Sequence, residues 1–142
     1  MIFRIPSRSR YAIDALIELA HNRSGAPVKI AEVARRRSIP PRYLEIILNR
    51  LKQAGLVASR RGSDGGYWLV SQPETLVAAE ILRAVDGPLS PLEQPQQGPV
   101  AYRAMWTRVQ HAIEGALQSV TLADLIREHE EALQSQAQDW VI

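Results

Sequence analysis

Apolar side chains recur at helical spacing in three short stretches of the first half of the chain. We expect helices over about residues 8–22, 29–36 and 41–53. The third stretch is the clearest, because four large aliphatic residues at i, i+3, i+4 and i+7 form one inward-facing stripe: Leu44, Ile47, Leu48 and Leu51. Pro41 suits the first turn of this helix, and Gly55 suits its C-terminal cap.

Two β-rich runs follow, over residues 56–59 and 67–70. The segment between them, 60–66, contains three glycines together with serine and aspartate, residues that tolerate the backbone angles of a tight turn. The pattern therefore predicts a small two-stranded hairpin. Helices followed by a hairpin in this order are typical of a winged helix-turn-helix.

The second half predicts more helix. A short helix over about 75–85 is followed by a proline-rich linker, 86–99, and then by a long helical pattern over about 100–118. The long pattern has an apolar side: Met105, Val109, Ala112, Ile113, Ala116 and Leu117. Thr121 and Asp124 resemble a capping box that starts a last helix. The expected fold class is mainly α: a winged helix-turn-helix with a small two-stranded β-wing and a long helix.

Composition narrows the chemistry. The 142 residues include no cysteine, which excludes disulfides, a thiol nucleophile, thiolate zinc sites and cysteine-held iron–sulfur clusters. We find neither an apolar run long enough to cross a membrane nor the apolar region of a signal peptide. We therefore expect a cytoplasmic protein with no membrane partner.

The net charge of +2 hides a strong asymmetry. Residues 1–62 hold 13 Lys and Arg against 4 Asp and Glu, a net charge of +9, whereas residues 63–142 carry a net charge of −7. A basic half indicates a nucleic-acid surface. Scattered, solvated charge is the alternative.

The third predicted helix carries candidate base-reading residues on its polar faces. Arg42 suits a guanine or a phosphate, and Glu45 suits the amino group of cytosine. A carboxylate weakens binding to a polyanion, so Glu45 in the groove would serve discrimination. Alternatively, Glu45 pairs with Asn49 or with a neighbouring arginine on a solvated face.

Arginines at two other places are candidates for contacts with the DNA backbone. Arg60 and Arg61 flank the predicted wing turn and suit the minor groove or phosphates, with Arg61 preferred because it lies at the turn; ordinary surface arginines are the alternative. Arg8 and Arg10 lie at the start of the first predicted helix, where positive charge opposes the helix dipole. A bound anion would explain these two arginines, and Ser7 and Ser9 are candidate caps and phosphate ligands. The run 35–37 remains open between DNA contact and a helix C-terminus that favours positive charge.

Catalytic and metal sites find little support. The three histidines, His21, His111 and His129, fall in different predicted segments without ligand spacing, and we expect them at the surface. The glycine-rich turn lacks the Gly-Lys-Ser/Thr ending of a phosphate-binding loop. We therefore expect neither an enzyme, nor a metal site, nor a cofactor.

Nearly the whole chain resembles the IscR/NsrR/CymR-type family of winged-helix transcriptional regulators. The motifs that carry the resemblance lie, in order, at residues 10–13, 27–28, 30–34, 43–45, 51–57, 61–67, 81–89, 106 and 121–125. The resemblance implies a homodimer in which the long helix crosses its symmetry mate. It also implies that the helix of Tyr43 and Glu45 enters the major groove and that Arg61 approaches the minor groove. Three domains follow: 1–72 for DNA binding, 73–99 as a connecting helix and linker, and 100–142 for dimerisation.

The chain departs from this family at the sensor. Many members hold an iron–sulfur cluster with three cysteines, where this chain has the linker 86–99, and Arg103 lies about where some carry a histidine ligand. A cluster of that kind is excluded, so we expect an effector or a partner protein to provide the signal, with a pocket near the linker and Trp106 as one candidate. Pro40 and Arg42 replace small hydroxyl residues common in cluster-binding members, which suggests a different operator.

These observations predict a dimeric, sequence-specific DNA-binding regulator, more often a repressor by family habit. Two symmetric recognition helices imply double-stranded DNA with a pseudo-palindromic operator as the partner. The alternative is a protein-interaction winged-helix module that acts through a partner protein.

Overall fold

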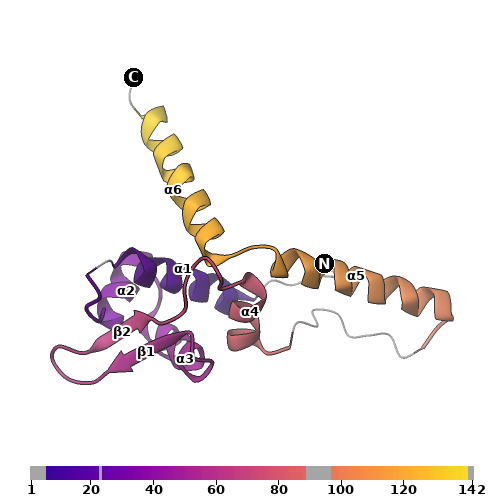
Figure 1. Ribbon diagram of the computed structural model, residues 1–142, viewed down its shortest axis with the longest axis horizontal. Coiled ribbons are helices and arrows are strands. Elements are labelled where there is room, and N and C mark those ends of the chain that lie inside the picture. Colours follow the sequence, from indigo (N-terminus) through magenta and orange to yellow (C-terminus); the bar gives the residue numbers. More distant parts are fainter. Residues whose placement is uncertain (1–5, 23, 89–96, 141–142) are drawn as a thin grey trace.

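The computed structural model describes residues 6–22, 24–88 and 97–140. Within these residues the chain forms helices and one antiparallel hairpin (Figure 1): α1 (Ser7–His21), α2 (Ile30–Arg37), α3 (Pro41–Gln53), β1 (Val57–Arg60), β2 (Gly66–Leu69), α4 (Ala78–Asp86), α5 (Val100–Gln118) and α6 (Leu122–Asp139). The mainly α fold with a two-stranded wing confirms the prediction. None of the helices in the described residues combines the length and the apolar character that a membrane span requires.

Helix α1 lies at the centre of the core. Its Ala12, Ala15 and Leu16 are completely buried and lie against α2, α3 and α4. The first turn of α6 reaches the same core through Leu122. The small alanines of α1 allow neighbouring helices to approach closely, and the larger aliphatic residues of α3 and α4 fill the remaining space.

The chain between α2 and α3 is a tight turn that fixes the angle of α3. Ser38 adopts the left-handed conformation at φ 53°, and the N–H of Ile39 bonds the carbonyl of Ala34. Ile39 is buried, and Pro41 opens α3 as expected. At the other end, Gly55 has φ +79° and the N–H of Leu56 bonds the carbonyl of Leu51, which is a Schellman motif.

The wing is a hairpin supported on one edge by a third segment. The strands pair with Val57 opposite Leu69 and Arg60 opposite Gly66, one residue later at the start than expected for β1 and one residue earlier for β2. Tyr67 also forms a two-bond bridge with Val28, so the sequence before α2 continues the sheet. This bridge anchors the base of the wing to the helix-turn-helix.

Helix α4 begins three residues later than expected because the preceding residues are bound elsewhere. Val77 forms a bridge with Thr121, and the N–H of Leu122 bonds the carbonyl of Leu76 at 2.7 Å. The starts of α4 and α6 are therefore held together. Thr121 and Asp124 form the predicted capping box.

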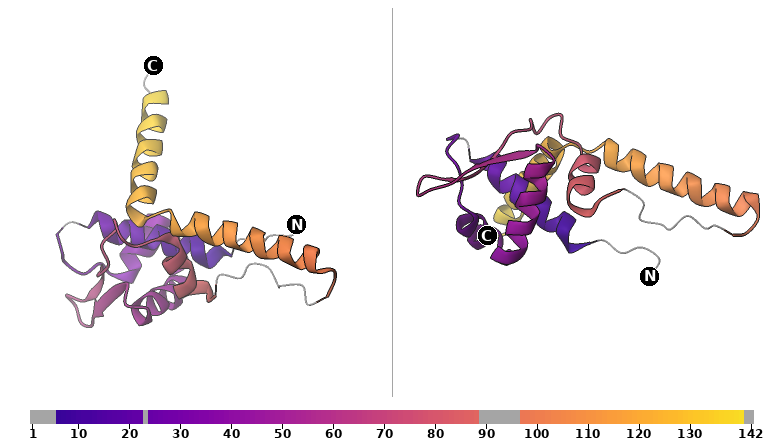
Figure 2. Two further views of the ribbon diagram at one scale, coloured as in Figure 1. Left: turned by 45° about the vertical axis from the view of Figure 1, so that its right-hand side comes forward. Right: turned by 90° about the horizontal axis from the view of Figure 1, so that it is seen from below.

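The last two helices leave the compact part of the molecule. Helix α5 extends sideways and α6 projects in another direction, which Figure 1 and both views of Figure 2 agree on. None of the described residues of α5 is buried, and in α6 only Leu122 is. The central part of the predicted linker, 89–96, lies outside the described residues.

Candidate nucleic-acid interface

Helix α3 defines the candidate interface because one of its faces is committed to the core. The four aliphatic residues predicted to face inward are each at most 1% exposed. Side chains on the remaining surface are exposed: Arg42, Tyr43, Glu45, Ile46, Asn49, Lys52 and Gln53. An α-helix with such a polar outer face fits the width of a DNA major groove.

The three candidate residues on α3 are free to meet a ligand. Within the described part of the chain, the side chains of Arg42, Tyr43 and Glu45 form no hydrogen bond or ion pair. The alternative pairing of Glu45 with Asn49 or an arginine is therefore not observed. A lone carboxylate on this face is available to accept a hydrogen bond.

The two arginines of the wing differ in their hydrogen bonding. Arg60 ends β1 and donates a hydrogen bond at 3.1 Å to the carbonyl of Asp64, across the turn. Arg61 lies in the turn, is exposed, and has no bond within the described residues. The turn itself requires glycine, because a Cβ on Gly65 would lie 2.1 Å from the carbonyl oxygen of Arg60. Arg60 thus stabilises the turn that presents Arg61.

The start of α1 differs from the expectation. Pro6 is the N-cap and no side chain caps the helix, so the expected capping by Ser7 and Ser9 is wrong. Ser9 is buried and donates its hydroxyl to the carbonyl of Pro6 at 2.8 Å. Ser7 and Arg8 are exposed, and Arg10 lies over the ring of Tyr11, 4.8 Å from its centroid.

The run of arginines at the end of α2 belongs to an ion network. Arg36 and Arg37 donate to the two carboxylate oxygens of Glu18 on α1 at 2.8 and 2.9 Å, and Arg35 and Arg36 pair with Glu32. Burial alone would raise the pKa of Glu18, but the hydrogen bonds and charges of Arg36 and Arg37 outweigh it and lower that pKa. These contacts give the arginine run a role within the fold.

Two contacts that involve histidines expected at the surface join α1 and α2 to α6. Arg37 lies 3.3 Å from the Nε2 of His129, which is half-buried, and His21 lies 3.1 Å from a carboxylate oxygen of Glu130. Both contacts span about a hundred residues of sequence, so no local pattern could predict them. They attach α6 to the helix-turn-helix.

One contact links α3 to the end of α4. Arg50, half-buried, donates to the carbonyl of Val85 at 2.6 Å. A cation at a helix C-terminus is favourable because it faces unpaired carbonyls. Arg50 therefore positions α3, whereas Arg42 faces outward.

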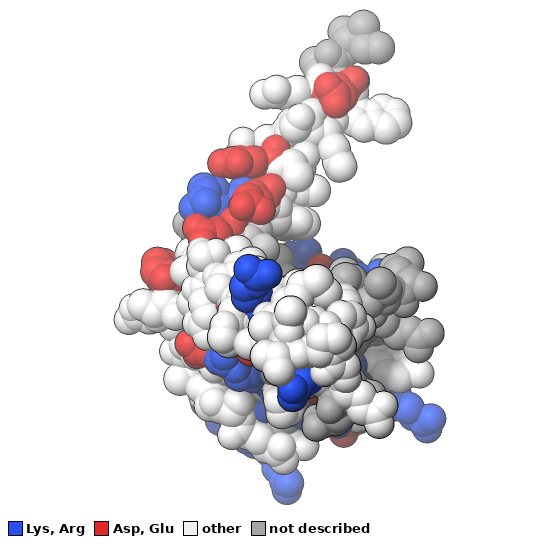
Figure 3. Space-filling view, turned by 90° about the vertical axis from the view of Figure 1, so that its right-hand side faces the viewer, with Lys and Arg blue, Asp and Glu red and all other residues white. Residues whose placement is uncertain are grey.

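Figure 1 and the left view of Figure 2 place α3 and the wing along the same side of the molecule, away from α6. Figure 3 shows acidic side chains gathered along α6, with Lys and Arg side chains projecting at the opposite end. No hydrogen bond or ion pair in the described segments joins Ser7, Arg8 or Arg10 to α3 or to the wing.

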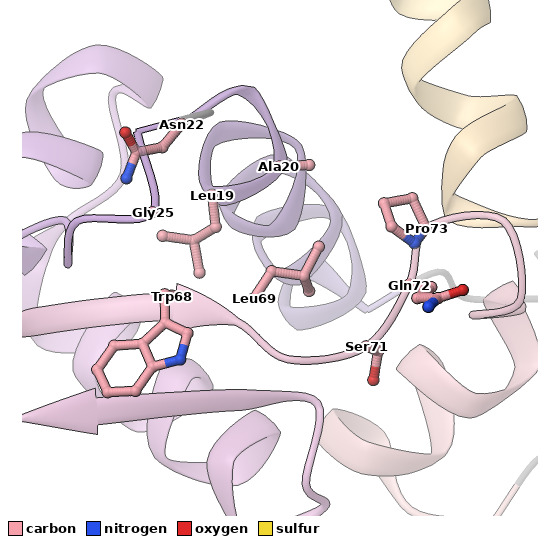
Figure 4. A pocket seen from close by; sticks show the side chains of 9 residues that line it. All are labelled: Leu19, Ala20, Asn22, Gly25, Trp68, Leu69, Ser71, Gln72 and Pro73. Carbon is pink, nitrogen blue, oxygen red and sulfur yellow. The ribbon is translucent and has the colours of Figure 1, made fainter.

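A shallow depression of about 280 Å³ lies between the end of α1 and the segment that follows β2 (Figure 4). Leu19, Trp68, Leu69 and Pro73 supply most of its apolar lining. It is not the pocket expected near Trp106, whose ring packs edge-on against Tyr102 with centroids 6.3 Å apart on α5.

Comparison with known proteins identifies the family to which this chain is similar. Residues 5–128 match the Rrf2 family, described as iron-dependent transcriptional regulator. This chain belongs to the Rrf2 family. It is 37% identical over 122 residues to the HTH-type transcriptional regulator CymR of Bacillus subtilis, covering 86% of this chain and 88% of CymR. It is 31% identical to IscR of Escherichia coli, covering 89% of this chain and 82% of IscR.

Solved Rrf2-type structures share the fold. The structure of CymR, the global cysteine regulator of B. subtilis, matches with a TM-score of 0.78 at 36% identity, over 88% of this chain and 97% of that chain. IscR of T. potens matches with a TM-score of 0.74 at 30% identity, over 91% and 90% of the two chains. The chain is a DNA-binding transcriptional regulator of the winged-helix class, as predicted.

The family description implies an iron site, but the residues of this chain do not fit one. The chain has no cysteine, and its described residues contain no group of three His, Asp or Glu side chains that could hold a metal ion. A cysteine-ligated cluster is therefore impossible here.

Proposed function

We propose that this regulator acts as a homodimeric repressor that binds a pseudo-palindromic operator. The observation that carries the proposal is the outer face of α3, where Arg42 and Glu45 are exposed and unpaired within the described residues. The arginines at the end of α2 are instead bound to carboxylates. The unpaired charges of the basic half thus include Arg42 on α3, a helix that can enter a major groove.

In this proposal each candidate residue has a role. Arg42 contacts guanine or phosphate, Glu45 accepts from a cytosine amino group, and Tyr43 lies at the opposite flank of the helix from Glu45. Arg61 approaches the minor groove or phosphates from the wing, on a turn held by Arg60. Backbone phosphates are contacted by the start of α1: Ser7, Arg8 and Arg10.

The dimer is proposed from the exposed apolar side of α5. Tyr102 and Met105 are both more than a third exposed, and Val109 is half-buried. A helix of 19 residues with so little burial needs a partner, because packing of an apolar face supplies most helical stability. A second copy crossing along α5 would satisfy both helices at once. Residues 1–72, 73–99 and 100–142 then divide into DNA binding, connection and dimerisation.

The signal is proposed to be an effector molecule or a partner protein, since thiolate chemistry is absent from the sequence. The proposal assigns no catalytic activity to the chain, whose relatives are transcriptional regulators. Binding to a chromosomal operator would place the protein in the cytoplasm.

The test is selection of bound duplexes from a random pool, followed by titration of the enriched sequence and of a random one. We expect a two-fold symmetric sequence with half-sites about one helical turn, or a multiple, apart. Affinity should fall steeply with salt. Weak binding without sequence preference would reject the proposal in favour of a protein-interaction module.

Substitution of Glu45 tests its role directly. Glu45→Ala should relax the preference at one base pair of each half-site, worth about 10-fold or more in discrimination. Binding to the random duplex should hold or improve, because a carboxylate near phosphates is removed. Equal weakening on both duplexes would count against base reading by Glu45.

A further inference from the structure

An exposed isoleucine lies in the middle of the polar face of α3. Ile46 is 49% exposed, whereas its neighbour Ile47 on the same helix is only 1% exposed. At about 100° per residue, the direction opposite the core stripe is occupied by positions 42, 46, 49 and 53. Ile46 therefore points outward between Arg42 and Asn49, whereas Glu45 and Tyr43 lie toward the flanks.

An apolar side chain on a surface that approaches DNA has one apolar partner in the major groove, the 5-methyl group of thymine. Asn49 has a partner of matching specificity, because its side-chain amide can bond both N6 and N7 of adenine. Positions 46 and 49 are i and i+3, so their Cβ atoms lie about 5–6 Å apart on the helix surface. Stacked base pairs are separated by about 3.4 Å, so the two side chains reach the same or adjacent base pairs.

We propose that Ile46 and Asn49 together read an A·T step in each half-site, with Ile46 packed on a thymine methyl group. Asn49 donates from its amide nitrogen to N7 of adenine and accepts from N6 with its oxygen. This specificity rests on the proposed entry of α3 into the major groove. It adds an apolar component to the polar reading by Arg42 and Glu45.

The test begins from the duplex enriched by the full-length protein. Each thymine is replaced in turn by deoxyuridine, which pairs identically but lacks the methyl group, and affinity is measured by fluorescence anisotropy. At the contacted thymine we expect about fourfold weaker binding per half-site, the equivalent of about 0.8 kcal/mol for one buried methyl group. Ile46→Ala should bind the thymine duplex more weakly and should no longer distinguish it from the deoxyuridine duplex.

A parallel series tests Asn49. Replacement of adenine by 7-deazaadenine removes N7, and the wild-type protein should lose affinity at an adenine in the same or the adjacent base pair. Asn49→Ala should not respond to that replacement. Thymine and adenine positions that prove distant from one another would overturn the joint reading.

Val70→Ala is the matched control, since Val70 is an aliphatic residue with 56% exposure that lies outside α3. This variant should keep both the affinity and the deoxyuridine response of the wild type. Wild-type binding that ignores every deoxyuridine replacement, or an Ile46→Ala protein that retains the response, overturns the inference while the salt-dependent operator binding still stands. If no sequence is enriched, the proposed function fails and the inference fails with it.

Discussion

Arginine residues in the basic half fall into two groups that the sequence alone does not separate. Those at the end of α2 are bound by carboxylates, with Glu18 accepting from both Arg36 and Arg37. Arg42 and Arg61 are exposed and, within the described residues, unbound. The net charge of +9 in residues 1–62 therefore overstates what is available to DNA. Contacts that neutralise charge inside the fold cannot release counterions on binding.

Arg42→Ala and Arg61→Ala should each weaken duplex binding while leaving the fold intact. If each side chain contacts a phosphate, the slope of log affinity against log salt should become shallower by about 1. Arg35→Ala is a suitable control, because Arg35 is exposed and pairs with Glu32 within α2. The measurement is a salt titration by anisotropy. An unchanged slope in the first two variants, or an equal change in the control, would contradict this division.

Glu18→Gln should destabilise the protein in a pH-dependent manner. The lowered pKa of Glu18 means that its ionised form stabilises the folded state above the ordinary glutamate pKa. This contribution is lost as pH falls through the lowered pKa. We expect a cost of about 1–3 kcal/mol in the free energy of unfolding at pH 7, because two arginines lose a charged acceptor.

Urea denaturation of both proteins at pH 7 and at a series of lower pH values measures this effect. The difference in the free energy of unfolding should narrow as pH falls through the lowered pKa of Glu18, because the wild-type side chain then becomes neutral like glutamine. Glu32→Gln serves as the comparison, since the Glu32 side chain is 40% exposed and its pair with Arg36 should contribute less. A difference of the same size throughout the series would show that the charge of Glu18 is not the cause.

Elements with strong local signals were predictable. The expected range 41–53 for α3 coincides with the observed helix because Pro41 opens it and Gly55 closes it through backbone geometry. For α4 the spacing predicts a start that is too early, because the pattern around Leu76 is typical of a helix. In the structure the carbonyl of Leu76 bonds the N–H of Leu122, and a partner 46 positions away cannot be inferred from local spacing.

The candidate site shows the same limit. The outward placement of Arg42, Tyr43 and Glu45 followed from the helical period. The pairing of the α2 arginines depends on Glu18 in another helix, which no local pattern indicates. The exposure of Ile46 agrees with its position outside the inward stripe, which the sequence does indicate. Tertiary contacts determine which charged side chains are unpaired, and the helical period of the sequence does not reveal those contacts.

The wing depends on Gly65 for its closure. Gly65→Ala would place a methyl group 2.1 Å from the backbone oxygen of Arg60, so the turn must open. We expect a cost of about 1–3 kcal/mol from this overpacking and a loss of DNA affinity at least as large as that of Arg61→Ala. Ser63→Ala, in the same exposed turn, should leave both properties unchanged. Thermal unfolding and anisotropy measure them, and wild-type binding by Gly65→Ala would show that the wing does not contact DNA.

The whole molecule separates the side proposed to face DNA from the helices that extend away from it. Helix α3 and the wing lie on one side, whereas α5 and α6 project elsewhere (Figures 1 and 2). The bridge between Val77 and Thr121 and the contact of Arg50 with Val85 connect these parts through α4. In the proposed dimer, a change in how two copies meet along α5 would therefore act on the position of α3 through a short, hydrogen-bonded path.

Met105→Glu should separate the proposed dimer. Met105 is 39% exposed on the apolar side of α5, and burying a carboxylate between two crossing helices without a cationic partner is strongly unfavourable. Sedimentation at micromolar concentration should show a mass near 15.9 kDa for the variant and twice that for the wild type. Operator affinity should fall by about 100-fold or more, because two linked recognition helices bind far more tightly than one.

Met105→Leu is the matched control and should remain dimeric, since it conserves volume and apolar character. Arg61→Ala should also remain dimeric, although it binds DNA more weakly, so the two defects are separable. A Met105→Glu protein that sediments as a dimer and keeps its operator affinity would place the interface elsewhere on the molecule. The exposed apolar side of α5 would then require a partner of another kind, because a solvent-exposed face of this character is unfavourable in a free helix.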